Sequence, residues 1–474
     1  MTEENLAWSE LQYISIFAKN NIMETEVKQN IMGYEPIPKL IMKLSLPLML
    51  SMLIQALYNV VDSIFVARVS EASLTAVSLA YPLQNLMIAF GIGTAVGVNS
   101  YLARKLGEKK HNEAEMAANN GIFLAIITWL AFALFGIFGT RPFLSLFTDD
   151  PELLKLSVDY AGICLIFSFG IFIDITAERI MQATGDSIHP MITQSMGAIT
   201  NIILDPVFIF VFDMGVSGAA IATVLGQIVS MFAALYFVSK NQFVRISFSF
   251  KTFRPSGKII KEIYAVGVPT IIMNSVSTVM VSALNSILIA FSATAVSVLG
   301  VYFKLQSFIF MPVFGLQTGM IPIIAFNYGA KKKERMLKTL KVGLIIAVCV
   351  MIIGFLIFQL LPEVLLSFFA ASADMDRIGK PALRIISLCF IPAAISISLT
   401  SMFQATGIGY ASMIVSIVRQ LAVLLPVSVL LASTGILENV WFAFIIAEGV
   451  GLTLSILFFI YVYRKKVKPI PASL

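Results

Sequence analysis

The chain has 474 residues, of which 58% are hydrophobic and 13% are charged, and it carries a formal net charge of +6. This composition excludes an ordinary soluble domain and predicts a helical integral membrane protein. The surplus of Lys and Arg lies beside short loops between apolar stretches, so it does not indicate nucleic-acid binding.

Residues 1–36 are polar to mixed in composition and lack the charged, apolar and small-residue order of a signal peptide. We expect them to be a disordered cytoplasmic extension. Met23 and Met32 precede a segment that resembles a start, so the first 22 residues are either part of this extension or an over-long gene prediction.

Twelve apolar stretches follow, and each is long enough to cross a bilayer, which requires about 20 residues. Their spans are 40–66, 74–103, 116–139, 157–181, 188–212, 216–239, 260–290, 295–327, 337–361, 381–405, 410–432 and 440–463. Each half has six spans, an even number, so the chain enters and leaves the membrane on the same side in both halves. The halves are therefore parallel repeats. We predict an N-terminal lobe, a linker, a C-terminal lobe and a basic cytoplasmic tail at 37–239, 240–259, 260–463 and 464–474.

An internal repeat relates the two halves at a constant offset of 222 residues. The sequence QATG at 182–185 returns at 404–407, and Pro47 returns as Pro269. The buried acids do not repeat, because Asp205 has Val427 at its shifted position. We therefore expect an all-α membrane fold of two pseudo-symmetric six-helix lobes around a central cavity, with a single acid site.

Lys and Arg gather beside the loops of one predicted face, as at Arg104, Lys105, Lys109 and Lys110, and are sparser on the opposite face. Short loops rich in Lys and Arg stay in the cytoplasm. We expect a multi-pass protein of the cell membrane with both termini in the cytoplasm.

Two of the apolar stretches carry polar stripes at the helical spacing i, i+3, i+4, i+7. The stripe of the first stretch is Gln55, Tyr58, Asn59 and Asp62, and that of the fifth is Gln194, Ala198, Asn201 and Asp205. An ionisable group in the bilayer costs about 2.5–3.5 kcal/mol on insertion scales, so each acid is a functional candidate. The alternative is that the stripes join helices through side-chain hydrogen bonds.

Pro206 directly follows Asp205 and predicts a kink, because proline cannot donate to the carbonyl of Ile202. A freed carbonyl beside a carboxylate and Asn201 is a set of oxygen ligands that suits a small hard cation. Two carboxylates held close in low dielectric would instead share a proton, because both cannot ionise cheaply. We favour proton coupling, with sodium competing for the same oxygens; a structural kink with an incidental acid is the alternative.

Other charged residues also occur in only one half. Asp174 and Glu178 are either cavity acids that attract cationic solutes, or Glu178 pairs with Arg179. For Lys304, Arg419 and Glu448 we favour interhelical pairing over cavity lining.

The three cysteines and two histidines do not have the spacing of a metal site, and most such sites need three or four ligands. We expect no cofactor, and no metal other than sodium at the coupling site.

Several segments together resemble the multidrug and toxic compound extrusion (MATE) family. They are QALYNVVD at 55–62, IFVAR at 64–68, the two QATG segments, NIILDP at 201–206 and GVSGAAIAT at 215–223. The resemblance covers roughly residues 35–465. It implies two six-helix lobes around a central cavity and antiport of a proton or sodium against an organic, often cationic, compound.

The resemblance also implies where the sites lie. The cation site of similar prokaryotic proteins matches Asp62, Asn201, Asp205 and Thr223. For the substrate cavity we expect Gln55, Tyr58, Asn59, Gln194, Asp174 and Glu178.

We therefore expect a secondary active multidrug efflux antiporter that works as a monomer, with small amphipathic or cationic molecules as substrates and lipids as neighbours. A lipid-linked oligosaccharide flippase is the nearest alternative, and should show more cationic residues in its cavity. The sequence does not support a major-facilitator transporter, because the Gly- and Arg-rich loop usual after the second helix of those proteins is absent here. An enzyme would need a catalytic constellation, and a receptor or scaffold would not explain acids that face inward.

Overall fold

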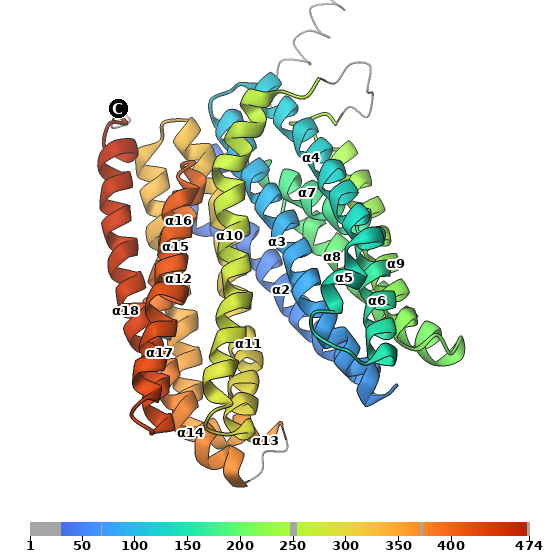
Figure 1. Ribbon diagram of the computed structural model, residues 1–474. Coiled ribbons are helices and arrows are strands. Elements are labelled where there is room, and N and C mark those ends of the chain that lie inside the picture. Colours follow the sequence, from blue (N-terminus) through green and yellow to red (C-terminus); the bar gives the residue numbers. More distant parts are fainter. Residues whose placement is uncertain (1–29, 68, 247–253, 370–372, 472–474) are drawn as a thin grey trace, which may run out of the picture.

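The computed structural model describes residues 30–67, 69–246, 254–369 and 373–471, without the side chains of 58–64, 66, 67 and 71. Most of these described residues are helical, and they contain no strand. The helices fall into two bundles, coloured blue to green and yellow to red in Figure 1.

The N-terminal bundle follows a single turn, η1 (Ile31–Gly33). Its elements are α2 (Ile37–Ala67), α3 (Glu71–Gly107), α4 (His111–Phe138), α5 (Thr140–Leu144), α6 (Pro151–Ile166), α7 (Phe169–Ala183), α8 (Ile188–Pro206), η2 (Val207–Val211) and α9 (Gly215–Ser239).

The C-terminal bundle repeats this order, with additions near its end. Its elements are α10 (Gly257–Leu288), α11 (Ala293–Gly329), α12 (Lys333–Leu360), α13 (Pro362–Ser367), α14 (Ala373–Ser387), α15 (Phe390–Ala405), α16 (Gly409–Ile417), η3 (Val418–Leu424), α17 (Leu425–Ala432), α18 (Leu437–Val462) and η4 (Tyr463–Val467). The additions are α17, which follows the π-helical turn η3, and a further turn, η4, which follows the last long helix.

Within the described residues, ten helices are long and apolar enough to cross a membrane, and two bent pairs make twelve spans when each pair counts as one. The predicted helical membrane fold with two lobes is confirmed. The bends interrupt the stretches predicted at 157–181 and 381–405, by 45° between α6 and α7 and by 46° between α14 and α15. Ser168 and Ser387 lie at these breaks and donate to the carbonyls of Leu165 and Arg384, bonds that compete with regular helical pairing.

The 222-residue repeat extends to the helix caps and turns. The side chains of Ser70 and Ser292 each accept a backbone N–H at the start of α3 and α11. After α7 and α15, Gly185 and Gly407 take positive φ angles of 91° and 80°, which favour glycine. The two halves therefore share local backbone geometry as well as helix order.

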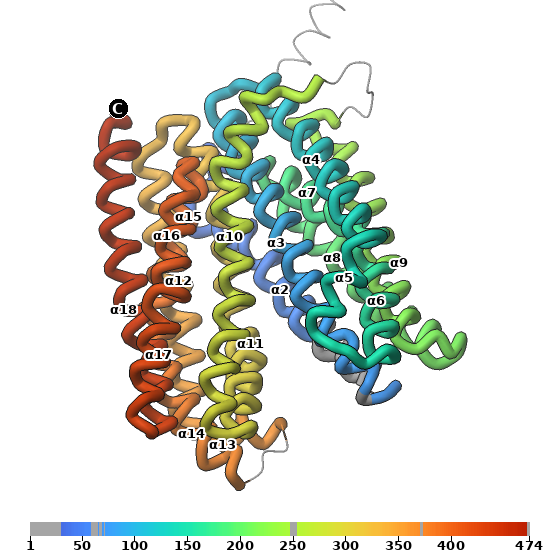
Figure 2. Tube along the Cα trace, viewed as in Figure 1, coloured from blue at the N-terminus to red at the C-terminus, as the bar shows by residue number. Residues whose placement is uncertain are grey.

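The two bundles meet at one end and diverge toward the other (Figures 1 and 2). We call the meeting end, where α3 and α11 end and α4 and α12 begin, the basic end. Here α2 packs against α11, and α3 packs against α10 and α11. A Cβ atom on Gly107 would lie 1.9 Å from the carbonyl oxygen of Phe326, and one on Gly329 would lie 2.1 Å from that of Arg104. Only glycine permits this symmetric approach.

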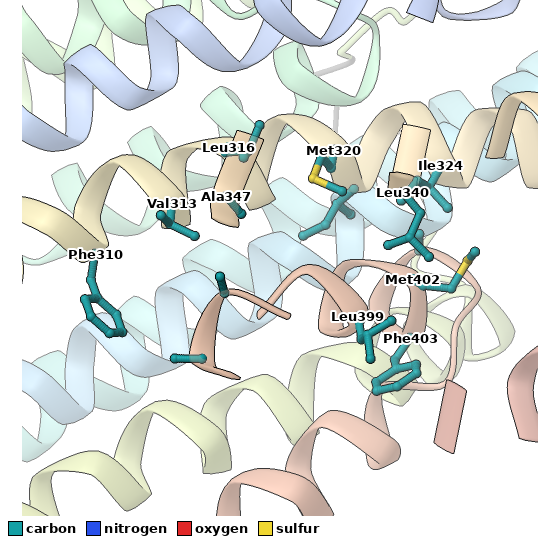
Figure 3. Packing of buried hydrophobic residues seen from close by; sticks show 14 of the residues in the cluster. Phe310, Val313, Leu316, Met320, Ile324, Leu340, Ala347, Leu399, Met402 and Phe403 are labelled. Atoms are coloured by element: carbon teal, nitrogen blue, oxygen red, sulfur yellow. The ribbon is translucent and has the colours of Figure 1, made fainter. Parts of the chain in front are cut away.

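A continuous hydrophobic core runs through the C-terminal bundle and across this contact, and includes Leu44 of α2 and Ile263 of α10. Along α11, Phe310, Val313, Leu316, Met320 and Ile324 recur at helical spacing and pack against α12 and α15 (Figure 3). A second core lies within the N-terminal bundle.

The expectation of disorder through residue 36 is wrong for residues 30–36, whereas residues 1–29 lie outside the described residues. Met32 is 0% exposed, and its carbonyl accepts from Asn327 and Arg335 of the C-terminal bundle. Asn30 donates to the carbonyl of Thr184 in the N-terminal bundle. This segment joins both bundles because buried apolar surface and satisfied backbone groups offset the cost of ordering it.

The structure also places the ends of the predicted linker and the start of the tail. The predicted linker 240–259 begins directly after α9, and α10 begins at Gly257, within its predicted end. The side chain of Asn241 in this linker donates to Thr184. Helical structure continues into the predicted tail as far as Val467.

Candidate functional site

Three of the four residues predicted for cation coupling have described side chains, and they lie together. Asp205 and Asn201 are one turn apart on α8 and are 0% and 2% exposed. The Asn201 amide Nδ2 donates to Asp205 Oδ1 at 3.3 Å and to Thr223 Oγ1 of α9 at 3.2 Å. The amide oxygen of Asn201 is buried and has no hydrogen-bond partner among the described residues. The cluster thus offers carboxylate, amide and hydroxyl oxygens.

Asp62, the fourth residue predicted for cation coupling, lies on α2 with the other members of the first polar stripe. The side chains of Tyr58, Asn59 and Asp62 lie outside what the structure describes, so their positions remain predictions. Gln55, one turn earlier, is partly buried. The α2 helix packs against α8, as a site shared between these helices requires.

A close approach of α8 and α9 positions the cluster. A Cβ atom on Gly226 would lie 2.7 Å from the carbonyl oxygen of Gly197 and 3.2 Å from the Cβ atom of Asn201. Without side chains at these two positions, the helices are near enough for Asn201 to reach Thr223.

At Pro206, where a kink is predicted, the helix changes from α-helical to π-helical geometry. The span continues from Ile188 to Val211 as one unit, and its last turn, η2, is π-helical. Pro206 has no N–H to donate to Ile202, so regular α-helical pairing is interrupted at Asp205. Single π-helical turns often occur at functional sites.

A second polar cluster joins α7, α8 and α9. Ser230 donates to Asp174 Oδ2 at 2.8 Å, and Thr193 donates to Glu178 Oε1 at 2.9 Å. Gln194 Nε2 donates to Glu178 Oε2 at 3.2 Å, and Ser51 of α2 donates to Gln194. Both acids are buried, and Asp174 Oδ1 has no hydrogen-bond partner among the described residues.

Glu178 forms no direct ion pair with Arg179 within the described part of the chain: Glu178 accepts from Thr193 and Gln194, while Arg179 Nη1 donates to Gln182 at 3.1 Å. Successive helix positions point in different directions, so adjacent residues do not face each other.

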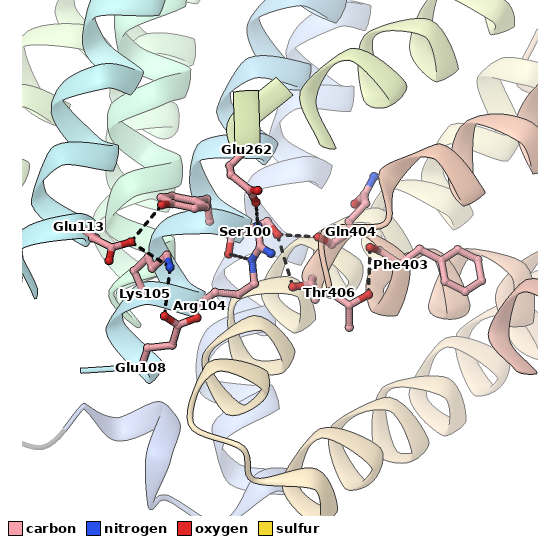
Figure 4. A network of polar contacts seen from close by, with 11 residues as sticks. Ser100, Arg104, Lys105, Glu108, Glu113, Glu262, Phe403, Gln404 and Thr406 are labelled. Carbon is pink, nitrogen blue, oxygen red and sulfur yellow. Dashed lines mark hydrogen bonds and ion pairs between the residues drawn. The ribbon is translucent and has the colours of Figure 1, made fainter. Parts of the chain in front are cut away.

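A polar network crosses between the bundles at the basic end (Figure 4). Ser100 of α3 donates to the carbonyl of Gln404 on α15 at 2.6 Å, and Arg104 lies 3.8 Å from Glu262 of α10. These contacts were not predicted from the sequence, although Gln404 belongs to the second QATG segment. Beside the network, burial alone would raise the pKa of Glu108, but Lys110 and Lys105 hold it below its usual value.

A cavity of about 320 Å³ lies within the C-terminal bundle. Arg419 of η3 and Glu448 of α18 line it and form an ion pair with an N–O distance of 3.1 Å. The predicted interhelical pairing is therefore confirmed for these two residues, and they line a cavity as well. Lys304 is exposed and makes no ion pair within the described residues. Gln55, Gln194, Asp174 and Glu178, predicted for the substrate cavity, do not line this one.

Comparison with known proteins gives consistent matches over both halves. The sequence model of the MatE family matches residues 47–207 and 269–430. The multidrug export protein MepA of Staphylococcus haemolyticus is 29% identical over 446 residues, which cover 92% of this chain and 96% of that protein. MepA of Staphylococcus saprophyticus is 26% identical over 428 residues, covering 90% and 94%.

Solved structures are also similar over nearly the whole chain. An outward-facing multidrug resistance MATE family transporter of the MOP superfamily has a TM-score of 0.87 and 26% identity, covering 94% of this chain and 99% of that chain. A MOP superfamily transporter from Pyrococcus furiosus has the same TM-score and coverage with 25% identity.

Proposed function

This chain belongs to the MatE family of membrane transporters, and we propose that it is a secondary active antiporter that exports organic, often cationic, compounds from the cell. The observation that carries this proposal is the buried cluster of Asp205, Asn201 and Thr223. An acid in a membrane helix is costly to keep, and the occurrence of Asp205 in one repeat only supports a coupling role for the N-terminal bundle.

The cluster suits either of two coupling ions. Carboxylate, amide and hydroxyl oxygens are ligands for sodium, whereas an acid in low dielectric also holds a proton. We propose that Asp62 contributes a second carboxylate from α2, and that the two acids share a proton. Binding of the ion would then remove the charge that a cationic substrate requires.

The orientation follows from the loop charges. We place the basic end and both termini on the cytoplasmic side of the cell membrane. The contact of α3 with α11 at Gly107 and Gly329 then supports a state that is closed to the cytoplasm. Export requires the bundles to separate at this end when substrate enters.

The test is efflux from a pump-deficient bacterial host that expresses the protein. Wild type should lower the accumulation of ethidium, a cationic aromatic dye, and raise resistance to it. Asp205→Asn should abolish both effects at equal expression, because the charge is lost while the shape is kept. Asp149→Asn, the same change at an exposed loop position, is the control.

Wild-type activity in Asp205→Asn would overturn the coupling site. Absence of efflux by the wild-type protein, together with restored transport of a lipid-linked oligosaccharide in a flippase-deficient host, would favour the flippase function.

A further inference from the structure

The repeat places different chemistry at one helix crossing in the two bundles. Arg419 and Glu448 occupy the positions that the 222-residue offset assigns to Gly197 and Gly226. In the N-terminal bundle these glycines bring α8 and α9 into backbone contact. In the C-terminal bundle the same crossing holds an ion pair between η3 and α18.

In the C-terminal bundle, charged side chains fill the crossing at which the N-terminal bundle has backbone contact. The ion pair lines the cavity of about 320 Å³, a volume within the range of small-molecule sites. Its walls are mainly apolar and aromatic and include Tyr302, Phe303, Phe310 and Phe444. Such walls favour a flat aromatic ligand.

The guanidinium of Arg419 uses only one of its three nitrogens in the ion pair. A single nitrogen, Nη1, donates to both Glu448 oxygens, at 3.2 and 3.1 Å. Nε and Nη2 make no hydrogen bond to any described residue, and the side chain is 26% exposed. An arginine that bonds a carboxylate with two nitrogens would have fewer donors left for a ligand.

The stem of Arg419 is held in place by packing. Its Cδ atom lies 2.8 Å from where a Cβ atom on Gly451 would be, so the stem crosses α18 directly over this glycine. The adjacent Gln420 has a buried Oε1 atom without a hydrogen-bond partner among the described residues. The cavity thus presents the fixed guanidinium of Arg419 to whatever enters it, whereas the amide oxygen of Gln420 is enclosed.

We propose that this cavity binds aromatic compounds that carry a carboxylate, with the carboxylate accepting from Arg419. The proposal rests on the transport function proposed above and extends it to acidic or zwitterionic substrates. A purely cationic ligand is disfavoured, because Glu448 is already paired and its side chain is only 10% exposed. Such a ligand would have to displace the guanidinium and leave it unpaired, which is costly.

The test compares 2-naphthoate with 2-naphthamide, which have the same ring system and differ in charge. Binding to purified protein in lipid nanodiscs is measured by equilibrium dialysis. Wild type should bind the carboxylate about tenfold more tightly than the amide, as expected for one hydrogen bond to a charged group. Arg419→Gln should bring this ratio close to one.

Glu448→Gln gives the opposite and more specific result, and it stays informative if Arg419→Gln fails to fold. Removal of the glutamate charge leaves Arg419 without its partner, so 2-naphthoate should bind still more tightly while 2-naphthamide changes little. Lys304→Gln, which removes an exposed cation outside the cavity lining, should change neither ligand.

Equal affinities for the two ligands in wild type would overturn the proposal. So would an unchanged preference in Arg419→Gln, weaker naphthoate binding in Glu448→Gln, or tighter binding of 2-naphthylmethylammonium than of 2-naphthoate. Ethidium efflux that depends on Asp205 distinguishes failure of this cavity proposal from failure of the proposed transport function, because it tests transport without reference to the cavity.

Discussion

The contact of α3 with α11 at the basic end should break when Gly107 is replaced by alanine. The new Cβ atom would lie 1.9 Å from the carbonyl oxygen of Phe326, so the helices must separate by about 1 Å or more to restore van der Waals contact. Overpacking of this kind costs about 1–3 kcal/mol, which shifts the ratio of closed to separated bundles by a factor of about 5 to 150.

A cysteine at Ser100 reports this separation, because Ser100 is 0% exposed and bonds across the contact to Gln404. With the three native cysteines replaced, a polar maleimide should label Ser100→Cys slowly in purified protein. Gly107→Ala should raise the labelling rate at least fivefold, by the lower bound of this estimate.

Gly449→Ala is the matched control, because a Cβ atom there would have no neighbour within 4 Å. An unchanged labelling rate in Gly107→Ala would refute the reasoning that this glycine contact holds the bundles together.

Three further changes test other parts of the structure. Gly226→Ala should impair ethidium efflux nearly as much as Asp205→Asn, because its Cβ atom would push α8 from α9 and separate Asn201 from Thr223; Gly162→Ala, at an open position, should not. Met32→Ala should lower the apparent melting temperature in detergent, since truncation of a buried methionine costs about 2–5 kcal/mol, whereas Met42→Ala at a 45% exposed position should have little effect. Substitution of Asn274 or Asn285 in α10 should reduce efflux much less than substitution of Asn59 or Asp62, and equal losses would show that coupling is shared between the bundles.

Much of the scaffold could be predicted because its signals are local or repeated. Apolar length predicts a membrane span directly, and the 222-residue offset carries the caps at Ser70 and Ser292 with it. Asn201 and Asp205 share a face because they are four residues apart on one helix.

Contacts between distant segments were harder to predict. Nothing local to residues 30–32 shows that Asn30 will bond to Thr184 and Met32 to Asn327, because these contacts depend on how the bundles meet. The environment of Glu178 was equally hidden, since its partners Thr193 and Gln194 come from the next helix. The correspondence of Arg419 and Glu448 with Gly197 and Gly226 is present in the sequence. That the ion pair lines a cavity depends on how several helices pack together, which the sequence does not show.

The most direct test of the central claim, that Asp205 couples ion movement to export, uses proteoliposomes without sodium and with an imposed pH gradient. Addition of ethidium should dissipate the gradient when wild-type protein is present, and should not do so with Asp205→Asn. Gradient dissipation by Asp205→Asn at the wild-type rate would contradict the claim. Transport that requires sodium and ignores the pH gradient would contradict proton coupling.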